Sequence, residues 1–334
     1  MANRKQLYTM RLLVLFPLLF AASTIASTIP QACNGYSALC SRKWSNISQI
    51  GTHDSAFVGI SPFDNQAVDI TKQLNAGIRF LQAQTHYFLG QLYLCHTSCI
   101  LRPAGPLVDY LTEIKKWLDK NPNEVVTLLL TNGDRKSVSL FGGAITSSAL
   151  NTYAYTPTKK LAIDEWPTLQ EMITSGKRFV VFLDYLADTT LVPYVLDEFQ
   201  YFFETAFDTT DSSFSSCDSD RPKPYTGSDL LPLINHYLDV GAEGILVPDR
   251  LALKTTNAAT GKGSIGAQAD LCTNQWKRKP RVMLVDFFDT GNVFAAQKTL
   301  NGLPLATSGS WKAISQTSNI ISFFIVMLIS LCAL

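Results

Sequence analysis

Two histidines in this sequence are placed where they could carry out acid–base chemistry. His53 stands in the segment GTHDS, directly before Asp54, and His96 stands in the segment LYLCHTSC. An imidazole has a pKa near neutrality, so it can accept or donate a proton at physiological pH. Two imidazoles on either side of a reacting group could therefore act as general base and general acid. The alternative for each histidine is a hydrogen-bonded place in a turn, and the elements that position them decide between the two interpretations.

The elements around these histidines follow an alternating pattern. Three short apolar runs lie at 125–131, 178–183 and 281–285. Such continuous apolarity is typical of strands that are covered on both faces, as in parallel sheets. Apolar residues recur at helical spacing over 107–118, and a shorter helical segment covers 169–173. This alternation predicts an α/β fold, and the length of the domain favours a (β/α)8 TIM barrel over a doubly wound sheet.

A polar residue follows each predicted strand at its carboxyl end. In a barrel these ends meet at one mouth, where catalytic groups collect. The alternative is that such residues begin a turn or cap the next helix. A stretch rich in Ser, Asp and Pro at 209–227 is expected to form a long loop, pinned by Cys217. The residues predicted at the mouth are His53, Gln84, His96, Asn132, Asp184 and Asp286.

The first 26 residues have the pattern of a cleaved secretory signal. A basic start with Arg4 and Lys5 precedes an apolar stretch at 12–22, which is too short to span a bilayer, and small residues follow near Ala26. The alternative, a buried first helix, does not explain the charge pattern. We therefore expect this segment to be removed.

The other end of the chain has the pattern of a glycosylphosphatidylinositol (GPI) attachment signal. Small residues at 308–310 precede a polar spacer at 311–319 and an apolar tail at 320–334. The alternative is a tail-anchored helix, but this tail is short for a membrane span. We expect attachment at Ser308 and removal of residues 309–334.

The segment between these signals, residues 27–308, is predicted to form a single domain. Without the two ends it carries 24 basic and 27 acidic residues, a net charge of −3, because Arg4, Lys5, Arg11 and Lys312 are removed with them. A charge so close to neutral gives no reason to expect nucleic-acid binding.

Cysteines and a sequon agree with an extracellular setting. Six cysteines remain in the domain, an even number that suits three disulfides in an oxidising compartment. Their spacing with histidine does not fit a zinc site. The sequence does not determine the pairing, and our working hypothesis is Cys33–Cys40, Cys95–Cys99 and Cys217–Cys272. Asn46 begins the only N-glycosylation sequon, Asn46-Ile47-Ser48.

Several of these segments together resemble a known family. GTHDS, GIRFLQAQTH at 77–86 and LYLCHTSC are similar to the X domain of phosphatidylinositol-specific phospholipase C and its relatives, the PLC-like phosphodiesterases. The likeness is strongest to secreted, GPI-anchored fungal members that contain the run TLLLTNGD. It continues through KRFVVFLDY, IGAQADLC and VMLVDFFD. The resemblance implies a distorted TIM barrel of the PLC-like phosphodiesterase type.

The resemblance also implies roles for four residues. His53 matches the base that takes a proton from the attacking hydroxyl, and His96 matches the acid that protonates the departing oxygen. Asp54 matches the residue beside the first histidine. Asp286 matches the late carboxylate that orients that histidine and stabilises its charged form.

Two positions depart from the family pattern. Gln82 and Gln84 share one face of their predicted strand and stand where related enzymes carry a carboxylate with an arginine, or two carboxylates that hold calcium. Neutral amides are poor replacements for carboxylates on calcium, and they cannot grip a phosphate as arginine does. Asn132 and Asp184 fall near positions where bacterial enzymes use cations on the inositol ring. We therefore expect all four to contact substrate, with no metal and no cofactor.

These observations predict an extracellular, GPI-anchored phosphodiesterase at the plasma membrane or cell wall. Its expected partners are a phospholipid or glycolipid phosphodiester and the outer membrane leaflet, and we expect it to be a monomer. One alternative is a cell-wall or surface protein that binds carbohydrate or lipid on a barrel without efficient chemistry. Another is a barrel glycosidase, which needs a pair of catalytic carboxylates; only Asp184 and Asp286 could be nominated.

Overall fold

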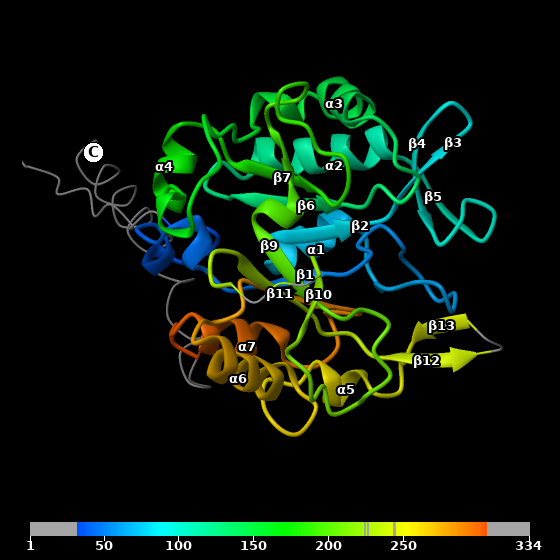
Figure 1. The fold of residues 1–334 in the computed structure, drawn as a ribbon, viewed down its shortest axis with the longest axis vertical. Helices are drawn as coiled ribbons and strands as arrows, with labels where there is room; N and C mark the ends of the chain where they lie inside the picture. The colour runs from blue at the N-terminus through cyan, green and yellow to red at the C-terminus, as the bar shows by residue number, and fades with distance from the viewer. Residues whose placement is uncertain (1–31, 224, 226, 243–244, 306–334) are drawn as a thin grey trace, which may run out of the picture. The chain divides into compact units, whose positions relative to one another are not determined.

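The computed structural model describes residues 32–223, 225, 227–242 and 245–305 (Figure 1). The predicted secretory signal, Ser308 and the predicted attachment signal lie outside the described residues. The described residues all belong to one compact unit, which begins at Gln31.

The described part of the chain is built on one curled sheet of nine strands. Their order is β10-β9-β11-β14-β1-β2-β6-β7-β8, and every neighbouring pair is parallel except β10 with β9. Among the described residues no ladder joins β10 to β8, so the barrel is incomplete and therefore distorted, as expected. The strands are β1 Gln49–Thr52, β2 Phe80–Ala83, β6 Val126–Leu130, β7 Phe179–Leu183, β8 Val195–Asp197, β9 Phe202–Thr205, β10 Ser219–Arg221, β11 Leu231–Asn235 and β14 Val282–Val285.

Helices cover the outside of this sheet. In Figure 1, α2 and α3 lie above the strands and α6 and α7 lie below them. Helix α2 presents an apolar face to the core, and its predicted extent is confirmed. The α-helices are α1 Ile70–Ala76, α2 Leu107–Lys120, α3 Val138–Ser147, α4 Leu169–Thr174, α5 Leu253–Thr256, α6 Ile265–Trp276 and α7 Val293–Leu300. The 3-10 helices are η1 Ser37–Leu39, η2 Trp44–Asn46, η3 Leu150–Thr152, η4 Ile163–Glu165 and η5 Glu198–Gln200.

Two small antiparallel sheets project from the carboxyl ends of the barrel strands. One contains β3 Thr85–Phe88, β4 Gln91–His96 and β5 Arg102–Pro106, and the other contains β12 Asp239–Ala242 and β13 Ile245–Pro248. Both stand at the right of Figure 1, on the side toward which β2 points. They place additional loops around the mouth of the barrel.

Buried arginines secure the opposite end of the barrel. Each precedes a strand and lies over an aromatic ring, where the guanidinium gains a cation–π contact while its stem is buried. Arg79 and Arg178 also donate to backbone carbonyl groups in the last turns of α1 and α2 or just after these helices. The pairs are Arg79 with Trp117, Arg178 with Tyr153 and Arg281 with Trp44.

The three hypothesised disulfides, Cys33–Cys40, Cys95–Cys99 and Cys217–Cys272, are all present. The third ties the 209–227 segment to α6, as expected. That segment is not loop throughout, however, because residues 219–221 pair with β9 as strand β10. The polar sequence of residues 219–221 is too short to show a strand pattern, so this pairing could not be predicted from the sequence.

Candidate active site

A cavity of about 570 Å³ opens at the carboxyl ends of the strands. Both His53 and His96 line it, together with Gln82, Gln84 and Asp184. These residues come from four separate strands or the loops that follow them. The structure therefore brings these side chains together in one polar cavity.

His53 is held in place from three sides. Its Nδ1 lies 2.9 Å from Oδ1 of Asp286, which follows β14. Asn65 donates from Nδ2 to the same carboxylate oxygen over 3.1 Å. The ring of Tyr237 stacks on the imidazole at 3.7 Å between centroids and 4° between planes. The imidazole is therefore fixed with its Nε2 directed away from Asp286.

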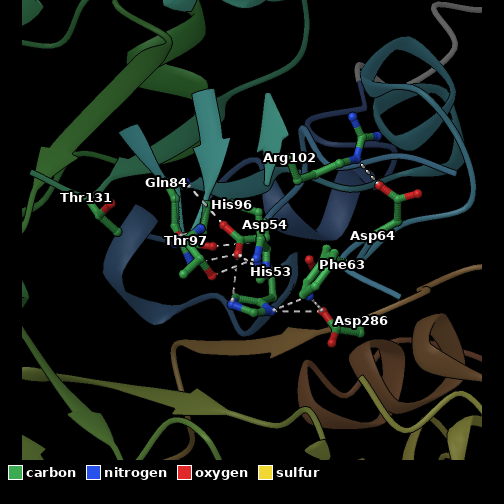
Figure 2. A network of polar contacts seen from close by, with 12 residues as sticks. His53, Asp54, Phe63, Asp64, Gln84, His96, Thr97, Arg102, Thr131 and Asp286 are labelled. Atoms are coloured by element: carbon green, nitrogen blue, oxygen red, sulfur yellow. Dashed lines mark hydrogen bonds and ion pairs between the residues drawn. The ribbon is translucent and has the colours of Figure 1, made fainter. Parts of the chain in front are cut away.

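Asp54 lies between the two histidines, as Figure 2 shows. Its Oδ2 is 3.6 Å from Nε2 of His53 and 3.5 Å from Nε2 of His96. The backbone of Asp54 adopts a left-handed conformation with φ of 42°, which few residues other than glycine tolerate. Gln82 secures it by accepting from the Asp54 N–H over 2.7 Å, and Gln84 donates to Oδ2 over 2.9 Å. Both glutamines thus position Asp54.

His96 sits in a short loop closed by the Cys95–Cys99 disulfide. The next residue, Thr97, has φ of 60°, an unfavourable value for a β-branched side chain. Its N–H donates to Oε1 of Gln84, and its hydroxyl lies 3.1 Å from Nδ1 of His96. Phe57 packs edge-on against the imidazole at 5.3 Å. The strained loop is therefore held by a covalent link and by hydrogen bonds.

The surroundings give the two imidazoles different charges. Burial alone would lower the pKa of His53, but the carboxylates of Asp54 and Asp286 outweigh it and raise that pKa to about 9. Burial, assisted by the charge on His53, lowers the pKa of His96 to about 4. Burial raises the pKa of Asp54 to about 6. At neutral pH the site thus contains one protonated and one neutral imidazole.

The cavity also contains an arginine that the sequence did not predict. Arg221, on β10, forms an ion pair with Glu204 of β9 and lies over the ring of Phe207 at 4.7 Å. Glu198 is 1% exposed, and burial, together with neighbouring Glu204, raises its pKa well above the ordinary range. Burial also raises the pKa of Asp184 to about 6. The cavity therefore has a cation, but its charge is already paired.

Asn132, expected to contact substrate, does not line this cavity. Its Nδ2 donates to the carbonyl groups of Lys136 and Tyr185, and its Oδ1 accepts from the Lys136 N–H. The side chain is thereby occupied in shaping a loop, which is the turn role that the strand-end pattern also allowed. Asp184 does line the cavity, and one oxygen accepts from the Asn132 N–H over 2.6 Å.

The other two histidines, His86 and His236, do not line the cavity. His236 is fully buried, where its ring nitrogens contact Gln268 and the carbonyl group of Thr256. His86 lies in β3, where it contacts Asp134 over 3.0 Å and does not line the cavity.

Sequence reasoning missed several residues around the histidines, including Asn65, Tyr237 and Asp239. Tyr237 follows β11, so the strand-end pattern that selected the other residues could have identified it. Asn65 and Asp239 lie outside the predicted strands and had no such signal.

The described residues contain no cluster of three or more His, Cys, Asp or Glu side chains arranged to hold a metal ion. The two glutamine oxygens nearest the histidines are already used, because Oε1 of Gln82 accepts from Asp54 and Oε1 of Gln84 accepts from Thr97.

Comparisons with known proteins agree with this arrangement. Residues 39–301 match the family described as PI-PLC X 1. The chain is 48% identical over 291 residues to "PI-PLC X domain-containing protein 1" of Arthroderma benhamiae, covering 85% of this chain and 95% of that protein. It is 45% identical to an "Uncharacterized secreted protein" of the same fungus, covering 82% of this chain and 65% of that protein.

A solved structure supports the fold. A variant of phosphatidylinositol-specific phospholipase C from Staphylococcus aureus superposes with a TM-score of 0.52 at 14% identity, covering 79% of this chain and 95% of that one. At this level of identity the likeness concerns the barrel alone.

Proposed function

This chain belongs to the PI-PLC X domain family, and from that premise we propose that it is a phosphodiesterase whose acid–base groups are His53 and His96. The substrate is a phosphodiester with a free hydroxyl group on the carbon next to the one that carries the phosphate. The hydroxyl oxygen attacks phosphorus as its proton passes to one imidazole. The bond to the departing oxygen breaks as the other imidazole protonates that oxygen, leaving a cyclic phosphate.

One observation carries this proposal. Asp54 Oδ2 lies within 3.6 Å of both Nε2 atoms, so the two nitrogens border the same small volume of the cavity. Placed proton donors and acceptors of this kind contribute about a hundredfold to ten-thousandfold in rate. The pair also holds a single proton at neutral pH, which is the state that concerted acid–base catalysis requires.

We retain the division of roles that the family resemblance implies, with His53 as base and His96 as acid. Before substrate binds, the shared proton is on His53, so it must reach His96 before reaction. Asp54 lies between the two Nε2 atoms and provides the path, and an anionic phosphate beside His96 favours the protonated form of that imidazole.

A lipid substrate is supported by the loops around the mouth. Ile60 and Ile100 are 93% and 89% exposed on loops that follow β1 and β4, and Leu246 is exposed where it lines the cavity. Exposed apolar side chains on several loops around one opening suit contact with acyl chains. We propose a phospholipid or glycolipid at the cell surface, with Gln84 and Asp184 contacting its head group.

The proposed setting is extracellular, and the fungal relative called a secreted protein supports it. No helix among the described residues has the length and apolarity needed to cross a bilayer. We also propose GPI attachment near Ser308. Treating intact cells with a GPI-cleaving phospholipase should then release the protein, whereas retention with the 320–334 peptide still attached would contradict an anchor of this kind.

A second candidate function is supported by the state of Arg221. Because Glu204 already neutralises this guanidinium, it is poorly placed to stabilise charge that develops on a phosphate. A barrel of this kind could bind a head group at the surface without turning it over.

The two functions are separated by incubating the secreted protein with phosphodiesters that carry a neighbouring hydroxyl, phosphatidylinositol and phosphatidylglycerol among them. Phosphorus NMR should detect a cyclic phosphate, and a methyl phosphodiester without the hydroxyl should remain intact. Binding without any cyclic product would favour the second function.

A further inference from the structure

The acidic residues of the cavity fall into two groups. Asp184, Glu198 and Glu204 surround Arg221, which offsets part of their charge. Asp208 and Asp239 also line the cavity, and among the described residues neither carboxylate has a hydrogen-bond or ion-pair partner. Asp208 is exposed and Asp239 is half-buried, and burial followed by the neighbouring Asp286 raises the pKa of Asp239 to about 7. The protonated imidazole of His53 offsets part of the charge on Asp239, although the two side chains are too far apart to form an ion pair.

One buried acceptor in the cavity is also without a donor. Asn65 is 1% exposed and lines the cavity, and its Oδ1 has no partner among the described residues, although its Nδ2 donates to Asp286. A buried acceptor without a donor is unfavourable, so a ligand that supplies an N–H or O–H group would relieve it.

A phosphodiester enters this cavity with a charge of its own. A ligand with only that negative charge would meet the unpaired carboxylates of Asp208 and Asp239, with the one arginine of the cavity already paired to Glu204. A positive group elsewhere on the ligand would offset the carboxylates, and an N–H group of the ligand would satisfy Oδ1 of Asn65.

We infer that the head group carries a protonated amine, which binds against Asp208 and Asp239 while the phosphate lies at His53 and His96. The inference rests on the proposed function for the position of the phosphate. It narrows the substrate class to zwitterionic phosphodiesters that also keep a free hydroxyl next to the phosphate, such as amino-sugar esters. The specificity for charge then belongs to Asp208 and Asp239, because Arg221 is already paired with Glu204.

Two probes that differ in one charge test this inference without turnover. 2-Aminoethyl methyl phosphate carries the ammonium group, and 2-acetamidoethyl methyl phosphate does not; neither has the hydroxyl that cyclisation requires. Titration calorimetry on the intact secreted protein should show up to about fivefold tighter binding of the amine, since a partly exposed ion pair is worth up to roughly 1 kcal/mol. The preference should shrink as salt is added.

Variants then show which residues cause the preference for the amine. Asp239→Asn and Asp208→Asn should each reduce this preference, and the double variant should abolish it. Asp239→Glu keeps the charge and should therefore keep the preference. Asp270→Asn makes the same change of charge on the exposed face of α6 and should leave it unaltered. Thermal unfolding would verify that each variant is folded.

Equal affinity for the two probes, or a preference that survives in the double variant, would overturn the inference. Because binding is measured on uncleavable probes, the inference and the proposed function fail separately. A charge preference without cyclic phosphate from any substrate would contradict only the phosphodiesterase. Cyclic phosphate formation with no charge preference would contradict only the amine.

Discussion

The ring of Tyr237 lies parallel to the imidazole of His53, with 3.7 Å between their centroids and 4° between their planes. Tyr237 follows β11 and is almost completely buried, so its ring cannot swing away without opening the core. The stacking limits rotation of His53 about its own axis, while Asp286 holds its Nδ1. Together they fix the direction of Nε2.

The aromatic face, and not the hydroxyl group, should therefore matter at this position. Tyr237→Phe should keep kcat within about threefold of wild type, whereas Tyr237→Leu should lower kcat by about tenfold or more with KM little changed, because misplaced catalytic groups mainly affect the transition state. Steady-state kinetics would show this. Equal loss in both variants would instead assign the role to the hydroxyl.

Asp286 should set the alkaline limit of activity. Its carboxylate is among the groups that raise the pKa of His53 to about 9, so the catalytic proton is lost only above that pH. Asp286→Asn removes the charge, lowers the pKa of His53 and should move the alkaline limb of the kcat/KM profile to lower pH. The acid limb should begin near pH 6, where Asp54 becomes protonated, and should also move to lower pH, because the charge on Asp286 helps to raise the pKa of Asp54. An unmoved alkaline limb would show that another group titrates there.

Activity should not depend on a divalent metal ion. Gln82 and Gln84 stand where calcium-dependent relatives carry carboxylates, and both amide oxygens are already engaged by backbone N–H groups. Turnover should survive prolonged dialysis against EDTA. Loss of activity that calcium restores would show that these side chains had been misinterpreted.

The Cys95–Cys99 disulfide should affect catalysis more than its effect on stability would suggest. Its loop contains His96 and the strained Thr97, so removing the bridge by a double Ser substitution should lower kcat by about tenfold or more. Removing Cys33–Cys40 gives a matched control, because that bridge closes a similarly short loop that contributes no residue to the cavity. Each removal should destabilise the fold by about 2 kcal/mol. Equal kcat values in the two variants would contradict the positioning role.

The barrel and half of the site could be predicted because each depends on local pattern. Apolar runs such as 126–130 and 179–183 identify strands buried on both faces, and parallel strands place their carboxyl ends together. That geometry was enough to gather His53, Gln84 and Asp184, whereas His96 ends β4 of a small antiparallel sheet and reaches the cavity from there.

The rest of the site depends on contacts between distant segments. Asn65 reaches Asp286 across 221 residues of sequence, and Tyr237 meets His53 through packing alone. Arg221 enters the cavity because residues 219–221 pair with β9, although their composition is that of a loop. Asn132 stays out of the cavity because a residue at a strand end can also hydrogen-bond within the loop that follows it.

The roles of the two histidines can be separated with an activated leaving group. A p-nitrophenyl phosphodiester with a neighbouring hydroxyl needs little protonation of its leaving oxygen, so His96→Ala should retain far more activity on it than His53→Ala does. The reverse order would assign the base to His96, in keeping with the proton positions before substrate binds.

The central claim is tested most directly by measuring how fast cyclic phosphate forms from a natural phosphodiester. The measurement compares wild type with His53→Ala, His96→Ala and the double variant. Each single change should lower the rate by at least about a hundredfold, and the double variant should be little worse than either, because groups that act as one unit are not additive. Circular dichroism and thermal unfolding would verify the fold. Wild-type rates in either single variant, or losses that multiply in the double variant, would contradict a shared proton transfer by His53 and His96.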